Sequence, residues 1–310
     1  MTKVFIDGSA GTTGLRIRER LEARKDIELI LLPEALRKEP QARRDALHSA
    51  DIAFLCLPDD AAREAVALAG GSGCAIIDTS TAHRTAPGWV YGMAELAGQR
   101  AKIASSKRVA NPGCHASGFI ALVAPLVQAG VIAKDAKLSC FSLTGYSGGG
   151  KKMIAQYEDE ARDALLDAPR QYGLSQSHKH LKEMAAICGL DCAPVFSPIV
   201  ADFYSGMEVS VPLFGEWVAG GMARVREVLA DAYPGPIIRY VESADEGGFL
   251  SAGKLSGRDD MEVTVTGGDE RLLLTARFDN LGKGASGAAI QNMNILMGVD
   301  ETTGLIIKEA

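Results

Sequence analysis

One cysteine in the chain lies in a setting suited to nucleophilic chemistry. Cys114 follows the turn-forming residues Asn111, Pro112 and Gly113, and it opens an apolar stretch long enough for a helix of about four turns. A thiol at a helix N-terminus lies beside unpaired N–H groups, and these stabilise the thiolate. The same N–H groups can hold the oxyanion of a tetrahedral intermediate. We therefore predict that Cys114 is a nucleophile that forms a thioester, in preference to a buried structural thiol.

A thiolate nucleophile needs a group that carries protons, and the sequence contains five histidines. His178 and His180 open a predicted helix over Ser177–Cys188, in which Glu183 lies one turn after His180 and shares its face. We predict His180 as the acid–base residue, with Glu183 orienting it. His178 is two residues away and is expected to face elsewhere. His115 is next to the thiol in sequence, but consecutive helical residues point in different directions.

A zinc site is an alternative interpretation of this region. His178, His180, Cys188 and Cys192 fall within fifteen residues. However, the C-x-x-x-C spacing is not that of a zinc ribbon, and the two cysteines lie where a helix should end. We therefore expect no metal.

A glycine-rich turn follows the first apolar run of the chain. The run Val4–Ile6 reads as a strand and Thr13–Arg24 as an amphipathic helix, with three glycines spaced G-x-x-G-x-x-G where they join. Such glycines let the backbone approach a pyrophosphate at a helix N-terminus. The residues expected to bind a dinucleotide are Gly8, Ser9, Gly11, Thr12, Thr13 and Gly14.

The choice between NAD and NADP depends on the segment after the second apolar run. Glu34 lies about 20 residues past the last glycine, where an acid would hold the ribose 2′-hydroxyl of NAD. Arg37 and Lys38 follow and could pair with the 2′-phosphate of NADP. The basic pair favours NADP, although solvated loop charges would give the same pattern.

Two further glycine-rich loops could bind anions. Gly145 to Lys151 follows a strand pattern and precedes a helical one, and Asn280 to Gly287 has similar composition near the C-terminus. In such loops, backbone N–H groups and a lysine can cradle a phosphate. Each such loop alone is often only a turn, but together with the thiol and the dinucleotide loop they indicate a functional site.

The first third of the chain predicts a parallel sheet. Apolar runs alternate there with helical patterns, which is typical of a doubly wound α/β fold of Rossmann type. The predicted strands are Val4–Ile6, Ile27–Leu32, Ile52–Leu57, Ala75–Ile77, Lys102–Ala104 and Arg108–Ala110, and a helix is expected over Asp59–Ala69.

The pattern changes after Lys137 to that of an α+β domain. Strands are predicted over Leu138–Leu143, Met207–Leu213, Met261–Val265 and Leu272–Phe278, and helices over Lys152–Leu166, Ser177–Cys188, Gly221–Ala232 and Ala285–Met297. We expect a dinucleotide-binding domain over residues 1–113 and a substrate and dimerisation domain over residues 114–284. A C-terminal helical segment, about residues 285–310, is expected to return to the first domain.

Composition narrows the possible partners. A net charge of −6 argues against nucleic acid, which normally requires a basic patch. No apolar run reaches the roughly 18 to 20 residues that span a bilayer, so we expect no membrane partner. The first strand pattern leaves no room for a signal peptide. The expected location is the cytoplasm.

Taken together, these motifs resemble those of the N-acetyl-gamma-glutamyl-phosphate reductase family, in particular its short (type 2) branch. The resemblance runs nearly end to end. Its most specific parts are Asn111–Cys114 and Asp279–Gly287 with Gln291–Asn294. It also includes Gly8–Gly14, Ile77–Ser80, His83–Arg84, Tyr91–Glu95, Gly145–Lys151 and His178–His180 with Glu183.

The resemblance implies an NADP-dependent enzyme of arginine biosynthesis that acts on a small acyl phosphate. The acyl group would pass to Cys114 as a thioester and leave as an aldehyde. The family pattern implies further cofactor contacts from Pro58, Ser80 and Gly284. It implies substrate contacts from Arg84, Asn111, Ser147, Gly148, Lys151, His178 and Glu183. It also suggests a homo-oligomer, either a dimer or a tetramer.

The chain departs from the longer branch of this family at three places. His115-Ala-Ser117 stands where that branch has Tyr-Pro-Thr. Lys151 replaces an arginine, and Lys182 replaces the proline that precedes the glutamate equivalent to Glu183. These departures fit the short branch and leave open which histidine is catalytic. Two alternative functions also stay open. One is a related acyl-phosphate reductase, such as aspartate-semialdehyde dehydrogenase. The other is an NADP-binding redox sensor in which Cys114 is oxidised.

Overall fold

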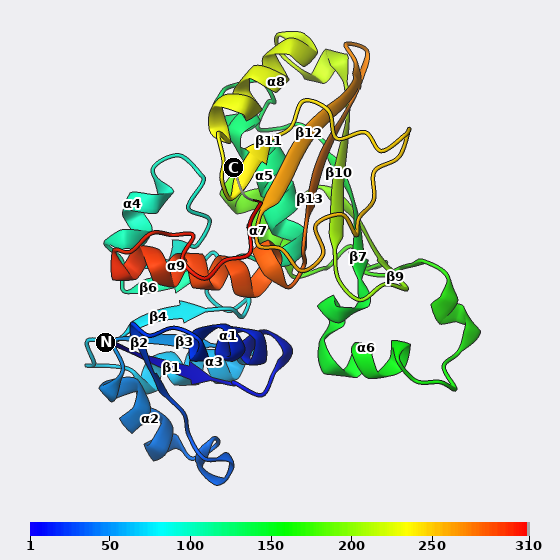
Figure 1. Cartoon of the computed structure of the whole chain (residues 1–310). Coiled ribbons are helices and arrows are strands. Elements are labelled where there is room, and N and C mark those ends of the chain that lie inside the picture. The colour runs from blue at the N-terminus through cyan, green and yellow to red at the C-terminus, as the bar shows by residue number, and fades with distance from the viewer. Residues whose placement is uncertain (309–310) are drawn as a thin grey trace. The chain divides into compact units, whose positions relative to one another are not determined.

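The computed structural model describes residues 1–308 (Figure 1). The chain divides into two compact units. The first contains residues 1–94, 98–112 and 285–305, and the second contains residues 95–97, 113–284 and the segment from residue 306. Cys114, His178 and His180 all belong to the second unit.

The first unit is built on a parallel sheet of six strands in the order β2-β1-β3-β4-β6-β5. The strands are β1 (Thr2–Asp7), β2 (Ile27–Ile30), β3 (Ile52–Leu55), β4 (Ala75–Asp78), β5 (Val90–Tyr91) and β6 (Arg108–Ala110). All neighbouring pairs run parallel. The central strands β3 and β4 are buried along their whole length, as expected of a sheet covered on both faces. The predicted doubly wound α/β fold is confirmed.

Helices pack against both faces of this sheet. They are α1 (Thr12–Glu22), α2 (Pro40–Ser49), α3 (Asp59–Leu68), α4 (Gln99–Ala104) and α9 (Gly287–Met297). Successive strand residues point to opposite faces, so Val4 and Ile6 pack with α1, α4 and α9, whereas Phe5 packs with α2 and α3. The C-terminal helix α9 thereby contributes to the core of the first unit.

The prediction of a strand over Lys102–Ala104 was wrong, because these residues form the end of helix α4. Only Ile103 of that helix is buried, and Lys102 is exposed. A pattern of three residues cannot distinguish a short strand from one face of a helical turn. Gly98, in a left-handed conformation, marks the start of the helix.

The second unit contains a mixed sheet of seven strands in the order β11-β12-β13-β10-β7-β9-β8. The strands are β7 (Ser139–Gly145), β8 (Arg170–Gln171), β9 (Val195–Ala201), β10 (Met207–Phe214), β11 (Ile238–Tyr240), β12 (Met261–Gly268) and β13 (Arg271–Phe278). The four strands predicted from the sequence are present. β9 was missed because Ser197 and Pro198 interrupt its apolar pattern, and β8 and β11 were missed because they are very short.

Helix α5 (Cys114–Gln128) is the central helix of the second unit, and it packs on β10, β13, α7 (His180–Cys188) and α8 (Gly221–Ala232) (Figure 1). Residues 115–124 are all buried. A helix that is apolar on every side is expected in such a position. The hydroxyl of the buried Tyr233 donates to the carbonyl oxygen of Ala121 at 2.8 Å, which fixes the end of α8 to α5.

Two helix predictions in the second unit need correction. The helix expected over Lys152–Leu166 is shorter, because α6 spans Gly150–Tyr157 and a separate 3-10 turn covers Ala164–Asp167. The Asp163 carboxylate accepts the N–H of Leu165 and so begins that turn. The helix expected from Ser177 begins only at His180.

No helix within residues 1–308 combines the length and the apolar character that crossing a bilayer requires.

Candidate active site

Cys114 is the first residue of α5, as predicted. Gly113 precedes it in an extended conformation, with φ −82° and ψ 146°. Among residues 114–124, Cys114 alone is partly exposed. The N–H groups of a first helical turn have no partner within the helix, so they are directed toward the space beside this thiol. The arrangement suits a thiolate nucleophile and an oxyanion.

Three histidine rings gather next to the start of α5. The ring centroids of His115 and His178 are 5.7 Å apart, those of His115 and His180 5.6 Å, and those of His178 and His180 4.7 Å. Phe196 of β9 packs edge-on against His115 and His178. The expectation that His178 faces away from His180 was wrong, because His178 lies before the helix and not on it.

Glu183 connects His180 with the segment that carries the nucleophile. One carboxylate oxygen, Oε1, lies 3.9 Å from Nε2 of His180, which is an ionic contact and too long for a hydrogen bond. The other oxygen, Oε2, accepts the N–H of Gly113 at 3.2 Å. Glu183 is 1% exposed and His180 6%. The observed contacts of Glu183 are therefore those of a residue that orients its neighbours.

His178 caps helix α7. Its Nδ1 accepts the backbone N–H of His180, the first residue of that helix, at 3.2 Å. This contact gives His178 a structural role at the start of α7. His180 stays the predicted residue for carrying a proton.

His115 was set aside on the sequence, yet it lies at the centre of this cluster. It is 3% exposed, its Nδ1 is 2.6 Å from the Ser142 hydroxyl, and its Nε2 is 2.6 Å from the Tyr172 hydroxyl. Burial lowers the pKa of His115 to about 3, and the charge of His178 lowers it further. The ring is therefore neutral at physiological pH.

The two predicted anion loops meet within the second unit. Asn280 donates to the hydroxyl of Ser147 at 3.0 Å and accepts the N–H of Gly206 at 2.9 Å. A side chain placed on Gly148 would touch the Asn280 amide at 3.4 Å. Asp279, fully buried, accepts the N–H groups of Leu281, Gly282 and Gly257 and the hydroxyl of Ser205, which fixes the backbone that leads to Gly284.

Gly284 lies directly against the nucleophile. A Cβ atom added there would be 2.9 Å from Cβ of Cys114 and 3.1 Å from the carbonyl oxygen of Asp279. Only glycine allows the second anion loop to approach the thiol so closely. The sequence suggested Gly284 as a cofactor contact, and the observed contact is with Cys114.

The two lysines of these loops are placed differently. Lys283 is buried and its ammonium group is 2.6 Å from the Glu95 carboxylate, so this lysine is not the accessible cation that the loop pattern suggested. Lys151 is exposed on α6. Nothing in the described residues links it to Cys114.

In the first unit, the predicted dinucleotide loop has the shape that a pyrophosphate needs. Gly8 has φ +88°, and a Cβ there would lie 2.3 Å from the carbonyl oxygen of Cys56. A Cβ on Gly14 would lie 2.4 Å from the carbonyl oxygen of Gly8. Gly11 precedes α1, whose first residues are Thr12 and Thr13. The backbone cradle at this helix start fits a dinucleotide.

Other predicted cofactor residues follow neighbouring strands of the same sheet. Ser9, Pro58 and Ser80 come shortly after β1, β3 and β4, which are adjacent and parallel, so all three lie at the carboxyl edge where dinucleotides bind. Pro58 begins α3, and the Ser80 hydroxyl donates to Asp78 at 2.7 Å. Arg37 and Lys38 follow β2 at this edge, and Arg37 donates to the Leu32 carbonyl at 3.3 Å.

Two predicted substrate contacts, Arg84 and Asn111, bond to each other within the first unit. Arg84 donates to the carbonyl oxygens of Asn111 at 3.0 Å and of Thr79 at 3.1 Å. Asn111 donates to the Ala285 carbonyl and accepts from Asn292. Both side chains are buried and hold the backbone in place. A role in substrate binding remains a prediction.

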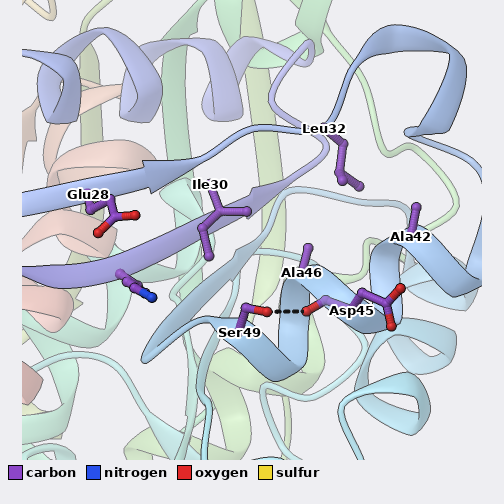
Figure 2. Close-up of a pocket in the computed structure, with 8 residues that line it drawn as sticks. Glu28, Ile30, Leu32, Ala42, Asp45, Ala46 and Ser49 are labelled. Atoms are coloured by element: carbon purple, nitrogen blue, oxygen red, sulfur yellow. Dashed lines mark hydrogen bonds between the residues drawn. The ribbon is translucent and has the colours of Figure 1, made fainter.

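A shallow cavity of about 450 Å³ lies beside β2 and α2 (Figure 2). Lys3, Glu28, Ile30, Leu32, Ala42, Asp45, Ala46 and Ser49 line it. None of these residues is among the predicted site residues, and we assign the cavity no ligand. Within residues 1–308, no group of three or more histidine, cysteine, aspartate or glutamate side chains is arranged to hold a metal ion.

The sequence interpretation also missed Gln176, which holds the loop between β8 and α7. Its side-chain amide donates to the carbonyl oxygen of Phe196 at 2.7 Å and accepts the N–H of the same residue at 2.8 Å. Gln176 has φ +56°, a strained value for a residue other than glycine. This loop contains Tyr172 and His178, so Gln176 fixes two members of the aromatic cluster to β9.

We expect Gln176→Ala to destabilise the second unit. The substitution keeps the strained backbone but removes two partly buried hydrogen bonds, each worth about 1 kcal/mol. The midpoint of chemical denaturation, monitored by fluorescence, should therefore fall. Gln176→Gly is the matched control, because it relieves the strain as well. If the alanine variant is as stable as the wild type, the hydrogen bonds of the Gln176 amide contribute nothing to the stability of the second unit.

Comparison with known proteins identifies the domains of the chain and its relatives. Residues 33–105 match the family model of the semialdehyde dehydrogenase NAD-binding domain, and residues 114–280 match that of the semialdehyde dehydrogenase dimerisation domain. The chain is 51% identical over 306 residues to a protein of Brucella anthropi named N-acetyl-gamma-glutamyl-phosphate reductase, covering 96% of this chain and 98% of that protein. A Rhizobium meliloti protein of the same name is 49% identical over 305 residues, covering 95% and 98%.

Solved structures show the same fold at low identity. Aspartate semialdehyde dehydrogenase II of Vibrio cholerae, complexed with ASA, superposes with a TM-score of 0.72 at 17% identity, covering 96% of this chain and 98% of the other. The Candida albicans aspartate semialdehyde dehydrogenase with NADP gives 0.67 at 13% identity, covering 96% and 99%. These similarities establish the fold alone.

Proposed function

We propose that this chain, which belongs to the N-acetyl-gamma-glutamyl-phosphate reductase family, reduces N-acetyl-gamma-glutamyl phosphate to N-acetylglutamate 5-semialdehyde and phosphate, a step of arginine biosynthesis. The observation that carries the proposal is the setting of Cys114. It begins a buried helix, packs against Gly284 and follows a residue whose N–H is held by Glu183, the neighbour of His180. That arrangement suits transfer of an acyl group to sulfur.

The first half of the reaction uses the start of α5. The Cys114 thiolate attacks the acyl carbon, and the N–H groups of the first helical turn stabilise the oxyanion that forms. Phosphate leaves as the carbonyl reforms, and a thioester remains on Cys114. Ser147, Gly148 and Lys151 are proposed to bind the phosphate or the substrate carboxylate, with Arg84 and Asn111 as further contacts.

The second half needs a hydride and a proton. When bound, the nicotinamide supplies the hydride to the thioester carbon. His180 gives a proton to the carbonyl oxygen, which forms a hemithioacetal, and takes it back as the carbon–sulfur bond breaks. The products are the semialdehyde and the free thiolate. Glu183 stabilises the imidazolium form of His180 while it holds the proton.

Turnover of a panel of acyl phosphates tests this function. N-acetyl-gamma-glutamyl phosphate should support NADPH oxidation far better than beta-aspartyl phosphate does. Preference for the aspartyl compound would instead indicate an aspartate-semialdehyde dehydrogenase. If no acyl phosphate supports oxidation, a redox sensor becomes the better interpretation.

The chain binds a nicotinamide dinucleotide, and we propose that the preferred one is NADP. Arg37 and Lys38 follow β2 at the edge where the adenosine ribose should lie. We expect Arg37→Gln/Lys38→Gln to raise the KM for NADPH about tenfold, since two exposed charge pairs contribute about 1 kcal/mol or less each. The KM for NADH should change little. A wild-type preference for NADH would instead support Glu34 as the ribose partner.

We also propose that the enzyme is a cytoplasmic homo-oligomer, with the first unit binding the dinucleotide and the second binding substrate and partner. The match to a dimerisation domain supports this interpretation. Phe141 of β7 and Phe214 of β10 are about half exposed, as expected of an uncovered sheet face. Sedimentation should therefore give a dimer or a tetramer.

A further inference from the structure

We propose that His115 is a positioning residue for the reaction described above, acting through Tyr172 and the two neighbouring histidines. The expected effects on kcat rest on the proposed function. The contacts of His115 all lie within the second unit and do not depend on that function. His115 is the residue after the nucleophile, and its ring lies in a buried cluster with His178 and His180.

Three separate elements fix the His115 ring. α5 supplies its backbone, Ser142 of β7 bonds to its Nδ1, and Tyr172, which follows β8, bonds to its Nε2. Both nitrogens are therefore occupied, at 2.6 Å each. The N–H of Tyr172 donates to the Pro198 carbonyl of β9, so the tyrosine backbone is also held. With these contacts the ring has one orientation available.

The neutral state of the ring lets both contacts form at once. A neutral imidazole has one donor nitrogen and one acceptor nitrogen. One of the two hydroxyls, Ser142 or Tyr172, therefore donates to the ring and the other accepts from it. Burial raises the pKa of Tyr172, and the charge of Cys114 raises it further, so the phenol keeps its proton. Both contacts of the ring therefore persist at neutral pH.

The same ring packs against the rings of His178 and His180. The groups facing His115 are Ser142, Tyr172, His178, His180 and the ring of Phe196. Because His115 does not take up a proton, it adds no charge that would oppose protonation of His180. It can therefore contact the proton carrier without competing for the proton. A lysine or arginine at this position would repel the imidazolium.

Paired substitutions test the proposal. His115→Phe keeps a ring but removes both nitrogens, and Tyr172→Phe removes only the hydroxyl. Each should lower kcat about tenfold with little change in KM, because the same buried hydrogen bond is lost. The double variant should be no slower than the slower single variant, since both substitutions break the same contact. His115→Gln, whose amide reaches the position of Nε2, should recover part of the rate.

Tyr233→Phe is the matched control. It removes the hydroxyl of another buried tyrosine, one that donates to Ala121 on the same helix α5. It should lower stability and leave kcat unchanged. If Tyr233→Phe slows turnover as much as Tyr172→Phe, the effect is a general loosening of α5 and the proposal fails. Losses that multiply in the double variant would also overturn it.

Alkylation of Cys114 by iodoacetamide gives a readout that does not depend on the substrate. The alkylation rate at neutral pH should fall in His115→Phe and Tyr172→Phe by the same factor, because both substitutions break the same contact in the cluster beside the start of α5. It should not change in Tyr233→Phe. If His115→Phe does not fold, Ser142→Ala and Tyr172→Phe provide the same comparison. Equal alkylation in all variants would refute the proposal, whereas failure of wild-type turnover would refute only the proposed function.

Discussion

Cys114→Ala is expected to abolish turnover, with a loss on the order of 10⁴-fold or more, because no other group can accept the acyl chain. Binding of NADPH should persist. The dinucleotide loop, Gly8 to Gly14, belongs to the first unit and the nucleophile to the second. Alanine at the start of α5 is a good helix former and removes only the sulfur.

Three measurements check this expectation. NADPH oxidation reports turnover, mass spectrometry of the protein mixed with acyl phosphate reports the thioester, and fluorescence titration reports cofactor binding. Cys192→Ala is the matched control, because Cys192 is another partly exposed cysteine of the second unit. It should behave as the wild type. An acyl adduct on the Cys114→Ala protein would show that another residue is the nucleophile.

The features predicted correctly from the sequence are those fixed by neighbouring residues. The strand, glycine turn and helix around Gly8 to Gly14 follow from local conformational preferences. The position of Cys114 at a helix start follows from the turn before it and the apolar run after it. Gly8 and Gly14 then proved to have no room for a side chain, which explains why that pattern is informative.

The features that the sequence interpretation missed depend on contacts between segments that are distant in the chain. His178 lies before helix α7 and beside His115 because Gln176 and Tyr172 are bonded to Phe196 and Pro198 of β9. β9 itself contains a proline and was not recognised as a strand. Without β9, neither the aromatic cluster nor the roles of His115 and Tyr172 can be inferred. The helix-face argument about His178 failed for the same reason.

His180→Asn is expected to lower turnover by 10² to 10⁴-fold, the usual range for loss of a general acid–base group. Free imidazole titrates near pH 6.5, so histidine can both give and take a proton at working pH. The structure adds a reason to choose His180. Its Nε2 faces Glu183, whose other oxygen is bonded to the residue before Cys114, so Glu183 contacts both His180 and the start of α5.

His178→Asn is the matched control, and it should lower turnover far less than His180→Asn does. The asparagine side-chain oxygen can accept the N–H of His180 that Nδ1 of His178 now accepts, so the cap of α7 should survive. Turnover measured against pH for the wild type and both variants separates the two roles. His180→Asn should be slow and nearly independent of pH between about 5 and 8, while His178→Asn should keep the wild-type profile with weaker substrate binding. If His178→Asn is the slower enzyme and has lost the pH dependence, His178 carries the proton and the cap contact is incidental.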